Sequence, residues 1–128
     1  MEQEISYLKS YIAFQQMRMN ERFVLDMYFD PELKSQKIHP LLFQPLIENA
    51  FKYVGGDYRI KLELRLIDSQ ILFKIENPVS ENCVSDGSKG IGVENLKRRL
   101  SLLYLDNHSF NIDRIENIYI AKLTIKIV

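Results

Sequence analysis

Hydrophobic residues at the start of the chain recur at the spacing of an α-helix. Residues 2–20 contain no Gly or Pro, and their apolar positions fall on one stripe: Ile5, Leu8, Ile12 and Met19. A second apolar strip beside the first carries Tyr7, Tyr11 and Phe14. The pattern predicts a helix that is apolar on more than one side. Two explanations stay open: the helix packs only on its own sheet, or it also contacts a partner or a preceding segment.

The rest of the chain switches between the period of strands and the period of helices. Apolar residues at every second position predict strands at 23–30, 58–66, 71–77, 109–113 and 118–128. In the first of these strands, the side expected to be buried carries Phe23, Leu25, Met27 and Phe29. Helical spacing predicts two more helices, at 40–53 and 94–104. We expect Pro45 to kink the helix at 40–53, because proline lacks an N–H and crowds the preceding turn.

These elements together predict the fold class. They indicate an α+β protein built as a two-layer sandwich, with a mostly antiparallel, roughly five-stranded sheet and about three helices on one of its faces.

Asn77 continues the series of every-second positions that forms the apolar side of its strand. Ile71, Phe73 and Ile75 precede it at every second position, so its amide is expected to point toward the layer that covers the sheet, where it needs a polar partner. After it, residues 78–89 lose all periodicity and become small and polar. A loop of about 12 residues is uncommon in a compact domain unless it is functional or disordered. We interpret it as a mobile lid, with disorder as the alternative.

Composition and charge exclude several classes of partner. The chain has 128 residues, enough for one core, and its 17 basic and 17 acidic residues balance, so no overall field attracts nucleic acid or an anionic membrane. Its one cysteine, Cys83, cannot form an intrachain disulfide, which favours a reducing compartment. No apolar run approaches the roughly 18 residues of a membrane span. We therefore expect a cytoplasmic location, no nucleic-acid partner, and membrane attachment only through segments outside this chain.

Three polar residues of the helix at 40–53 carry candidate chemistry. Glu48, Asn49 and Lys52 stand at i, i+1 and i+4, so we expect them on one helical face opposite the apolar side. An amide oxygen suits Mg²⁺, an ammonium group suits phosphate oxygens, and a carboxylate can hold a water or a hydroxyl. The alternative is a surface helix with a Glu48–Lys52 ion pair, worth about 0.2 to 0.5 kcal/mol.

A second candidate feature is the glycine-flanked run directly before the helix at 94–104: Gly90, Ile91, Gly92 and Val93. The first N–H groups of a helix have no partner within it, and the helix dipole adds partial positive charge there. The run therefore predicts a phosphate site. A glycine pair of this spacing is weak evidence alone, because it occurs in many unrelated turns.

Taken together, these segments resemble the ATP-binding domain of the GHKL superfamily, and within it the C-terminal catalytic part of LytS/YehU-type sensor histidine kinases. Three stretches carry the resemblance: HPLLFQPLIENAFKY for the asparagine box, GIGVENLKRRLSLLY for the glycine box, and EISYLKSYIAFQQMR for the helix before the domain. It covers essentially the whole chain. It implies a leading helix at 1–22 that joins the domain to upstream segments, and an ATP-binding catalytic domain at 23–128.

The resemblance implies a Mg-ATP site and assigns its residues. Asn49 would ligand Mg²⁺, and Glu48 would be the catalytic residue that polarises or orients the attacking group. Lys52 would meet the phosphates, and Tyr53, in place of the His more usual in such kinases, would pack near the nucleotide. The residues implied to bind ATP are Asn49, Lys52, Tyr53, Asn77, Gly90, Ile91, Gly92, Val93 and Asn95.

Two features depart from the family pattern. The family has an Asp followed by glycines where this chain has Asn77, Pro78 and Val79. Asn77 would accept the adenine amino group without a charge, which lowers affinity roughly fivefold. The phosphate-accepting histidine motif is also missing: His39 lies before the asparagine box and His108 is expected in a turn after the last helix. Both histidines are expected to be structural or exposed.

The resemblance thus implies the catalytic domain of a two-component sensor histidine kinase, a transferase that donates the γ-phosphate of Mg-ATP to a histidine outside this chain. The chain alone would not autophosphorylate. Its implied partners are upstream phosphoacceptor and dimerisation helices, a second copy in the full-length homodimer and, indirectly, a response regulator. The implied location is the cytoplasmic part of an inner-membrane protein. The alternative, motivated by Asn77 and the missing glycines, is a degenerate non-catalytic GHKL-like module for docking or dimerisation.

Overall fold

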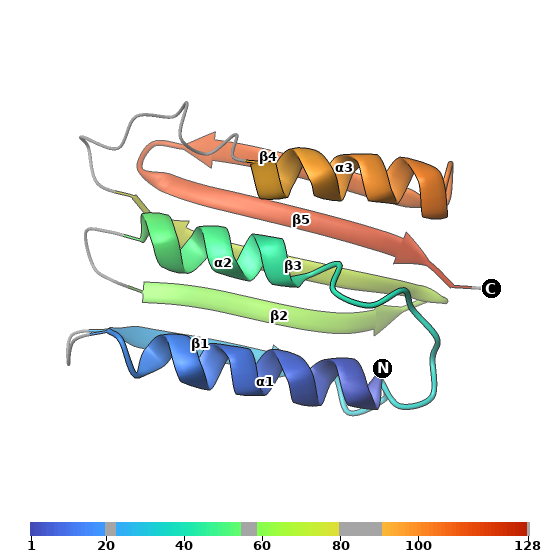
Figure 1. The fold of residues 1–128 in the computed structure, drawn as a ribbon, viewed down its shortest axis with the longest axis horizontal. Helices are drawn as coiled ribbons and strands as arrows, with labels where there is room; N and C mark the ends of the chain where they lie inside the picture. The colour runs from blue at the N-terminus through green and yellow to red at the C-terminus, as the bar shows by residue number, and fades with distance from the viewer. Residues whose placement is uncertain (20–22, 55–58, 80–90, 128) are drawn as a thin grey trace.

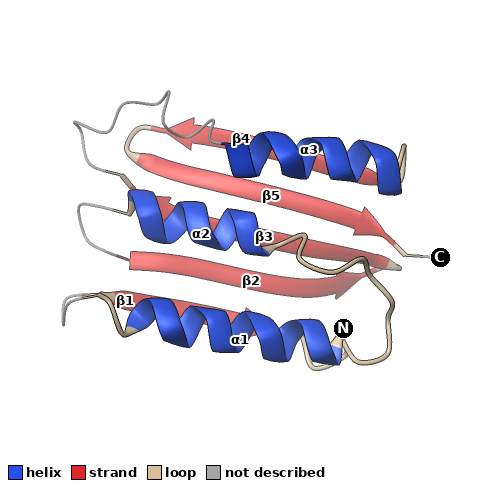
Figure 2. Cartoon of the chain, viewed as in Figure 1, coloured by secondary structure: helices blue, strands red, loops and turns tan. Residues whose placement is uncertain are grey.

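The computed structural model describes residues 1–19, 23–54, 59–79 and 91–127. The described elements form two layers, a five-stranded sheet with helices on one face (Figure 1, Figure 2). In chain order they are α1 (Glu2–Gln16), β1 (Val24–Phe29), α2 (Gln44–Tyr53), β2 (Arg59–Ile67), β3 (Gln70–Pro78), α3 (Ile91–Leu103), β4 (His108–Ile115) and β5 (Ile118–Lys126). The predicted α+β sandwich is confirmed.

The sheet is antiparallel except at one edge. Its strand order is β1-β2-β3-β5-β4, and the pairs β2–β3, β3–β5 and β4–β5 are antiparallel. β1 pairs with β2 in parallel, from Val24 opposite Arg59 to Phe29 opposite Leu64. A parallel pair needs a long crossover, and here the chain passes through α2 before it returns as β2.

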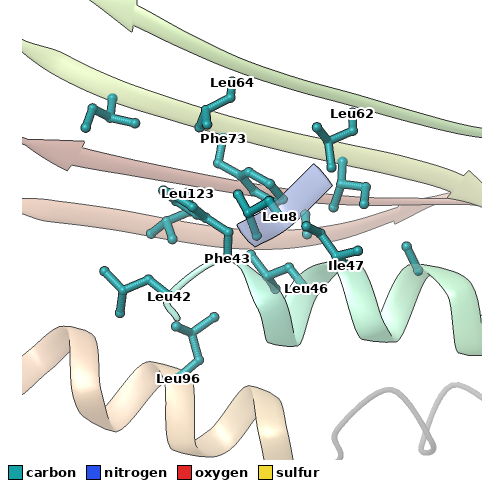
Figure 3. Close-up of a cluster of buried hydrophobic side chains, with 14 of the residues drawn as sticks. Leu8, Leu42, Phe43, Leu46, Ile47, Leu62, Leu64, Phe73, Leu96 and Leu123 are labelled. Carbon is teal, nitrogen blue, oxygen red and sulfur yellow. The ribbon is translucent and has the colours of Figure 1, made fainter. Parts of the chain in front are cut away.

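The core lies between the sheet and the helices. Along β2, β3 and β5, buried positions alternate with more exposed ones because helices cover one face of the sheet. Phe43, just before α2, stacks on Phe73 of β3 with ring centroids 4.8 Å apart (Figure 3). The three helices and the central strands share one cluster, which includes Leu8, Ile12, Leu46, Ile47, Ile60, Leu64, Phe73, Ile75, Leu96, Leu100 and Leu123.

α1 belongs to this core along one stripe and is apolar on its outer side as well. Leu8 and Ile12 are buried in the same cluster as the sheet residues, so the helix packs on its own sheet. On the outer side, Tyr7, Phe14 and Met17 are 43%, 60% and 84% exposed. This outer strip keeps a partner contact open as the second explanation. The domain division after residue 22 stays a prediction.

Three local expectations are wrong. The helix predicted at 40–53 begins at Gln44, so Pro45 lies in the first turn, where its missing N–H has no helical partner to lose and proline is tolerated without a kink. The strand predicted at 23–30 is an edge strand, and its Met27 is 44% exposed instead of buried. His108 is the first residue of β4 and not part of a turn.

Side chains of α3 and of the residue that follows it hold the connection that leads into α2. The guanidinium of Arg99 donates to the carbonyl oxygens of Pro40 (2.8 Å) and Leu41 (3.1 Å). The backbone N–H of His39 donates to the hydroxyl of Tyr104 (3.0 Å). Leu41 has a φ of 61°, a left-handed conformation that costs energy in a residue with a side chain. These contacts fix the start of α2 relative to α3.

Candidate functional site

The amphipathic pattern of α2 decides which side chains it offers to a site. Its buried side carries Leu46, Ile47, Ala50 and Phe51. The polar residues therefore lie on the remaining sides of the helix. Because consecutive helical residues are about 100° apart, neighbouring polar residues can face different elements.

Glu48 and Lys52 line a hollow of about 530 Å³ between α1 and α2. The other lining residues are Tyr11, Gln15, Arg18, Met19, Gln44 and Phe51. Burial, and after it the charge of Glu48, raise the pKa of Tyr11, as expected if the carboxylate and the hydroxyl share this hollow. Asn49 is not among the lining residues. Of the predicted polar trio, the structure brings Glu48 and Lys52 together in this hollow and places Asn49 outside it.

Asn49 lies on the side of α2 that faces the start of α3. Pro45, one turn earlier on the same side, approaches α3, since a Cβ added to Gly92 would lie 3.8 Å from the Cβ of Pro45. The side-chain nitrogen Nδ2 of Asn49 is buried and has no hydrogen-bond partner among the described residues. A buried donor without a partner costs about 1 to 3 kcal/mol. Asn49 therefore offers an unsatisfied amide close to α3.

Asn77 is buried, at 2% exposure, as its phase in the strand predicts. Its Nδ2 donates to the carbonyl oxygen of Pro78 at 3.1 Å, while its Oδ1 is buried and without a partner in the described part of the chain. The strand also continues further than predicted, because Pro78 ends β3 and Val79 bridges to Val54. Most of the predicted lid, residues 80–89, lies outside the described residues.

Asn49 and Asn77 lie at matching distances from the bridge between Val54 and Val79. Asn49 precedes Val54 by five residues of helix, about 7.5 Å along the axis. Asn77 precedes Val79 by two residues of strand, about 6.6 Å. α2 and β3 run in the same direction here (Figure 1). A buried donor on α2 and a buried acceptor on β3, both without partners among the described residues, thus lie at similar distances along their elements from the same bridge.

The N-terminal turn of α3 is the third part of the arrangement. The helix begins at Ile91, so Gly92 and Val93 lie in its first turn, where backbone N–H groups have no partner within the helix. Val93 is buried and anchors the turn in the core, whereas Asn95 and Gly92 are exposed. Gly90, the first glycine of the predicted phosphate site, lies outside the described residues. The described part of the predicted run thus lies at a helix N-terminus, as expected.

The side of the hollow formed by α1 and by the turn after it was not predicted from the sequence. Tyr11, Gln15 and Arg18 line it, although none of them was predicted as a site residue. A signal was present in the second strip of α1, whose tyrosines have polar tips suited to a boundary between helices. The hydroxyl of Tyr7 donates to Oε1 of Gln44 at 3.0 Å and joins α1 to α2 at the mouth of this region.

Comparison of the sequence with known proteins points to sensor kinases. No family model matches the chain. It is 25% identical over 130 residues to the sensor protein LytS of Enterococcus faecalis, covering 89% of this chain and 22% of that protein. It is 26% identical over 119 residues to the sensor histidine kinase YesM of Bacillus subtilis, covering 87% of this chain and 21% of that protein. The chain thus spans about a fifth of the length of these relatives.

Comparison of the fold with solved structures also gives histidine kinases. The histidine kinase AdeS of Acinetobacter baumannii superposes with a TM-score of 0.65 at 14% identity, covering 98% of this chain and 64% of AdeS. The catalytic domain of the histidine kinase ThkA gives a TM-score of 0.58 at 12% identity, covering 92% of this chain and 88% of that domain. The chain is a homologue of the LytS and YesM sensor histidine kinases. Its fold is that of the histidine-kinase catalytic domain, and the resemblance drawn from the sequence is confirmed.

The donor set of the described residues bears on what kind of metal the chain could hold. Among the residues that the structure describes, no three His, Cys, Asp or Glu side chains are grouped so as to hold a metal ion. Mg²⁺ bound to a nucleotide needs fewer protein ligands, because it keeps waters and phosphate oxygens and takes one or two protein oxygens. The side-chain amide oxygen of Asn49 is a ligand of this kind, and the amide nitrogen, which has no partner among the described residues, could donate to a phosphate oxygen.

The two histidines of this chain lie away from the hollow between α1 and α2. The ring of His39 is exposed and packs edge-on against the ring of Tyr104, with centroids 5.4 Å apart. His108 is half-buried at the start of β4, opposite Ile125. Neither residue lines the hollow beside Glu48. Across residues 1–19, 23–54, 59–79 and 91–127, no helix is long and apolar enough to cross a membrane.

Proposed function

We propose that this chain is the ATP-binding catalytic domain of a two-component sensor histidine kinase, which holds Mg-ATP and donates its γ-phosphate to a histidine outside the chain. Homology to LytS and YesM supports the kinase class, and likeness to a histidine-kinase catalytic domain supports the nucleotide. In the full-length protein, we place it on the cytoplasmic side of the membrane, in a homodimer that serves a response regulator.

The observation that carries this proposal is a pair of buried amide atoms without partners among the described residues, Nδ2 of Asn49 on α2 and Oδ1 of Asn77 on β3. The N-terminus of α3 comes close to α2 at Pro45. Buried polar atoms in folded proteins nearly always have partners, so two such atoms indicate a polar ligand. The amino group of adenine is a donor for Oδ1 of Asn77. Phosphate oxygens are acceptors for Nδ2 of Asn49 and for the free N–H groups of α3.

Each of the predicted site residues would then have its own role in binding or catalysis. Oδ1 of Asn49 would be the protein ligand of Mg²⁺, and the bound metal would neutralise phosphate charge. Lys52 would add a cation at the exposed end of α2, where its ammonium lies 5.2 Å from the centre of the Tyr53 ring. Glu48, from the side of the α1–α2 hollow, would orient the accepting group. Catalysis of this kind consists mainly of positioning and charge neutralisation.

Thermal unfolding tests the nucleotide site directly. Saturating Mg-ATP, or a non-hydrolysable analogue with Mg²⁺, should raise the melting temperature, since a ligand at one hundred times its Kd adds about 2.7 kcal/mol to the unfolding free energy. Asn49→Ala should remove the Mg²⁺-dependent part of this shift without lowering the melting temperature of the free protein, because it deletes an unsatisfied donor. Asn111→Ala, at an exposed position on β4, should keep the full shift.

Two further outcomes separate the alternatives. If neither ATP nor its analogue shifts the melting temperature, the non-catalytic docking module becomes the better description. Phosphoryl donation itself is measured with radiolabelled ATP and a separately supplied histidine-bearing helical segment of the full-length kinase. Acid-labile label on that segment, and none on the chain alone, is the expected result.

A further inference from the structure

Two hydrogen bonds join α1 to the start of α2 and to the residues before it, and both have the same separation in sequence. A carboxylate oxygen of Glu4 accepts the backbone N–H of Leu41 at 3.2 Å. The hydroxyl of Tyr7 donates to Oε1 of Gln44 at 3.0 Å. Each pair is 37 residues apart. Because α1 and α2 run side by side in the same direction (Figure 1), each further turn advances both helices by the same length. This separation therefore defines a register between the two helices.

The same register predicts the next contacts along the two helices. One turn further, it pairs Tyr11 with Glu48, and another turn further it pairs Gln15 with Lys52. All four of these residues line the hollow between α1 and α2. Burial raises the pKa of Tyr11 and the charge of Glu48 raises it further, which is the effect of a nearby carboxylate. The register, the lining of the hollow and the pKa of the phenol agree in placing Glu48 beside Tyr11.

The amide of Gln44 gives these contacts a direction. Its Oε1 accepts from Tyr7, so its Nε2 remains as a donor. Burial raises the pKa of Tyr11, whereas hydrogen bonds with Gln15 and Gln44 lower it. A hydrogen bond that lowers the pKa of a phenol is one that the phenol oxygen accepts. The hydroxyl hydrogen of Tyr11 is therefore left to donate, and the carboxylate of Glu48 is the acceptor opposite it.

The carboxylate of Glu48 needs such a donor to be held in one orientation. Among the described residues, Glu48 takes part in no ion pair, and the predicted pair with Lys52 is not formed. Its side chain is exposed, so packing alone does not select one rotamer. A hydroxyl on the neighbouring helix restricts the carboxylate, because it offers a hydrogen bond in one orientation only.

We propose that Tyr11 is a positioning residue whose hydroxyl, held by Gln44, donates to the carboxylate of Glu48 and fixes the orientation of that group. Because Tyr11 belongs to α1, the orientation of Glu48 then depends on how the leading helix packs on the domain. The effect on phosphoryl transfer rests on the proposed function, in which Glu48 orients the accepting group. The contact between the two side chains does not.

Titration of Tyr11 tests the contact without an enzymatic assay. NMR of protein isotope-labelled at the tyrosine Cζ follows the ionisation of each phenol, and Tyr11→Phe identifies the resonance. Glu48→Gln should lower the pKa of Tyr11, because it removes the nearby negative charge. Arg18, Lys52 and Tyr7, the other charged or titratable groups near this phenol, are the same in both proteins.

A remote carboxylate provides the control for this titration. Glu116→Gln, at an exposed position between β4 and β5, removes the same charge and should leave the pKa of Tyr11 unchanged. If Glu48→Gln also left it unchanged, or if both substitutions lowered it equally, the proposed contact would be excluded.

Phosphoryl transfer to the separately supplied histidine-bearing segment tests the role. Tyr11→Phe keeps the ring and removes the hydroxyl, so we expect kcat to fall about tenfold. The KM for Mg-ATP and the nucleotide-induced rise in melting temperature should stay at the wild-type values, because the hydroxyl does not contact the nucleotide. Tyr28→Phe, the same change at an exposed position of β1, should alter none of the three.

The outcomes keep this inference apart from the proposed function. Full kcat in Tyr11→Phe would reject the positioning role, while a nucleotide-induced rise in melting temperature would still support the kinase. An equal loss of kcat in Tyr11→Phe and Tyr28→Phe would also reject it. If Mg-ATP leaves the melting temperature of the wild type unchanged and Glu48→Gln lowers the pKa of Tyr11, the contact is supported and the proposed function fails.

Discussion

Asn77 donates its side-chain N–H to the carbonyl oxygen of Pro78, 3.1 Å away, and this bond fixes the orientation of the amide. The other end of the amide, Oδ1, is buried without a partner among the described residues. The chain thus has a neutral acceptor at this position, held by a hydrogen bond to the backbone that a carboxylate could not form, because a carboxylate has no N–H to donate.

Asn77→Asp should have opposite effects on the free protein and on nucleotide binding. A carboxylate cannot donate to Pro78, so we expect a lower melting temperature without ligand. If Oδ1 receives the adenine amino group, the charged acceptor should bind ATP about fivefold more tightly. Calorimetric titration and thermal unfolding measure the two effects. Unchanged ATP affinity in this variant would exclude a contact between residue 77 and the base.

Gly92→Ala should separate folding from phosphate binding. The added Cβ would meet Pro45 at 3.8 Å, an ordinary contact, so the fold has room for it. Alanine has the higher helix propensity, and we expect the unfolding free energy to rise by up to about 1 kcal/mol. If phosphate approaches the backbone here, ATP affinity should fall in the same variant. Ser101→Ala, exposed further along α3, is the control and should leave affinity alone. A gain in stability with full ATP affinity would remove Gly92 from the site.

Arg99→Ala should loosen the connection into α2. The guanidinium makes two hydrogen bonds to the carbonyl oxygens of Pro40 and Leu41. Their loss should cost about 1 to 2 kcal/mol in urea unfolding. Removal of the neighbouring exposed Arg98 should stay within about 0.5 kcal/mol of the wild type. Equal effects of the two substitutions would mean that these contacts do not hold the connection.

Asp30 should make the stability of the fold depend on pH in the acidic range. Its carboxylate accepts the backbone N–H groups of Glu32 (3.0 Å) and Leu66 (3.1 Å). These bonds, the one from Glu32 first, lower the pKa of Asp30 from its ordinary value of 3.8. Because the pKa is lower in the folded state, the charged carboxylate stabilises the fold at pH values above the ordinary pKa. This contribution disappears as the pH falls through the folded-state pKa. The wild type should therefore be more stable than Asp30→Asn at pH 7.

The same comparison in acid completes the test. Melting temperatures of the wild type and Asp30→Asn should converge once the pH is below the folded-state pKa of Asp30. Asp106→Asn, the same substitution at an exposed position, is the control for the loss of a surface carboxylate. A gap of constant size between pH 7 and acid would show that the charge of Asp30 plays no part and that only the shape of the side chain matters.

Period-two patterning was enough to predict β2 and β3 and the burial of Asn77, because both strands lie inside a sheet with one covered face. The same pattern failed at β1. Its neighbour on one side is β2, but no described strand lies along its other edge, and Met27 is exposed despite its phase. A sequence pattern records which residues share a side and not how well that side is covered.

The site divides in the same way. The residues themselves determined that α2 carries a carboxylate, an amide and an ammonium beside an apolar stripe, and that a glycine run opens α3. Only the tertiary structure decided that Glu48 and Lys52 face α1, that Asn49 faces α3, and that Tyr11, Gln15 and Arg18 complete a hollow. Helical spacing fixes angles about one axis, whereas the element that meets each angle depends on how separate helices pack on the sheet.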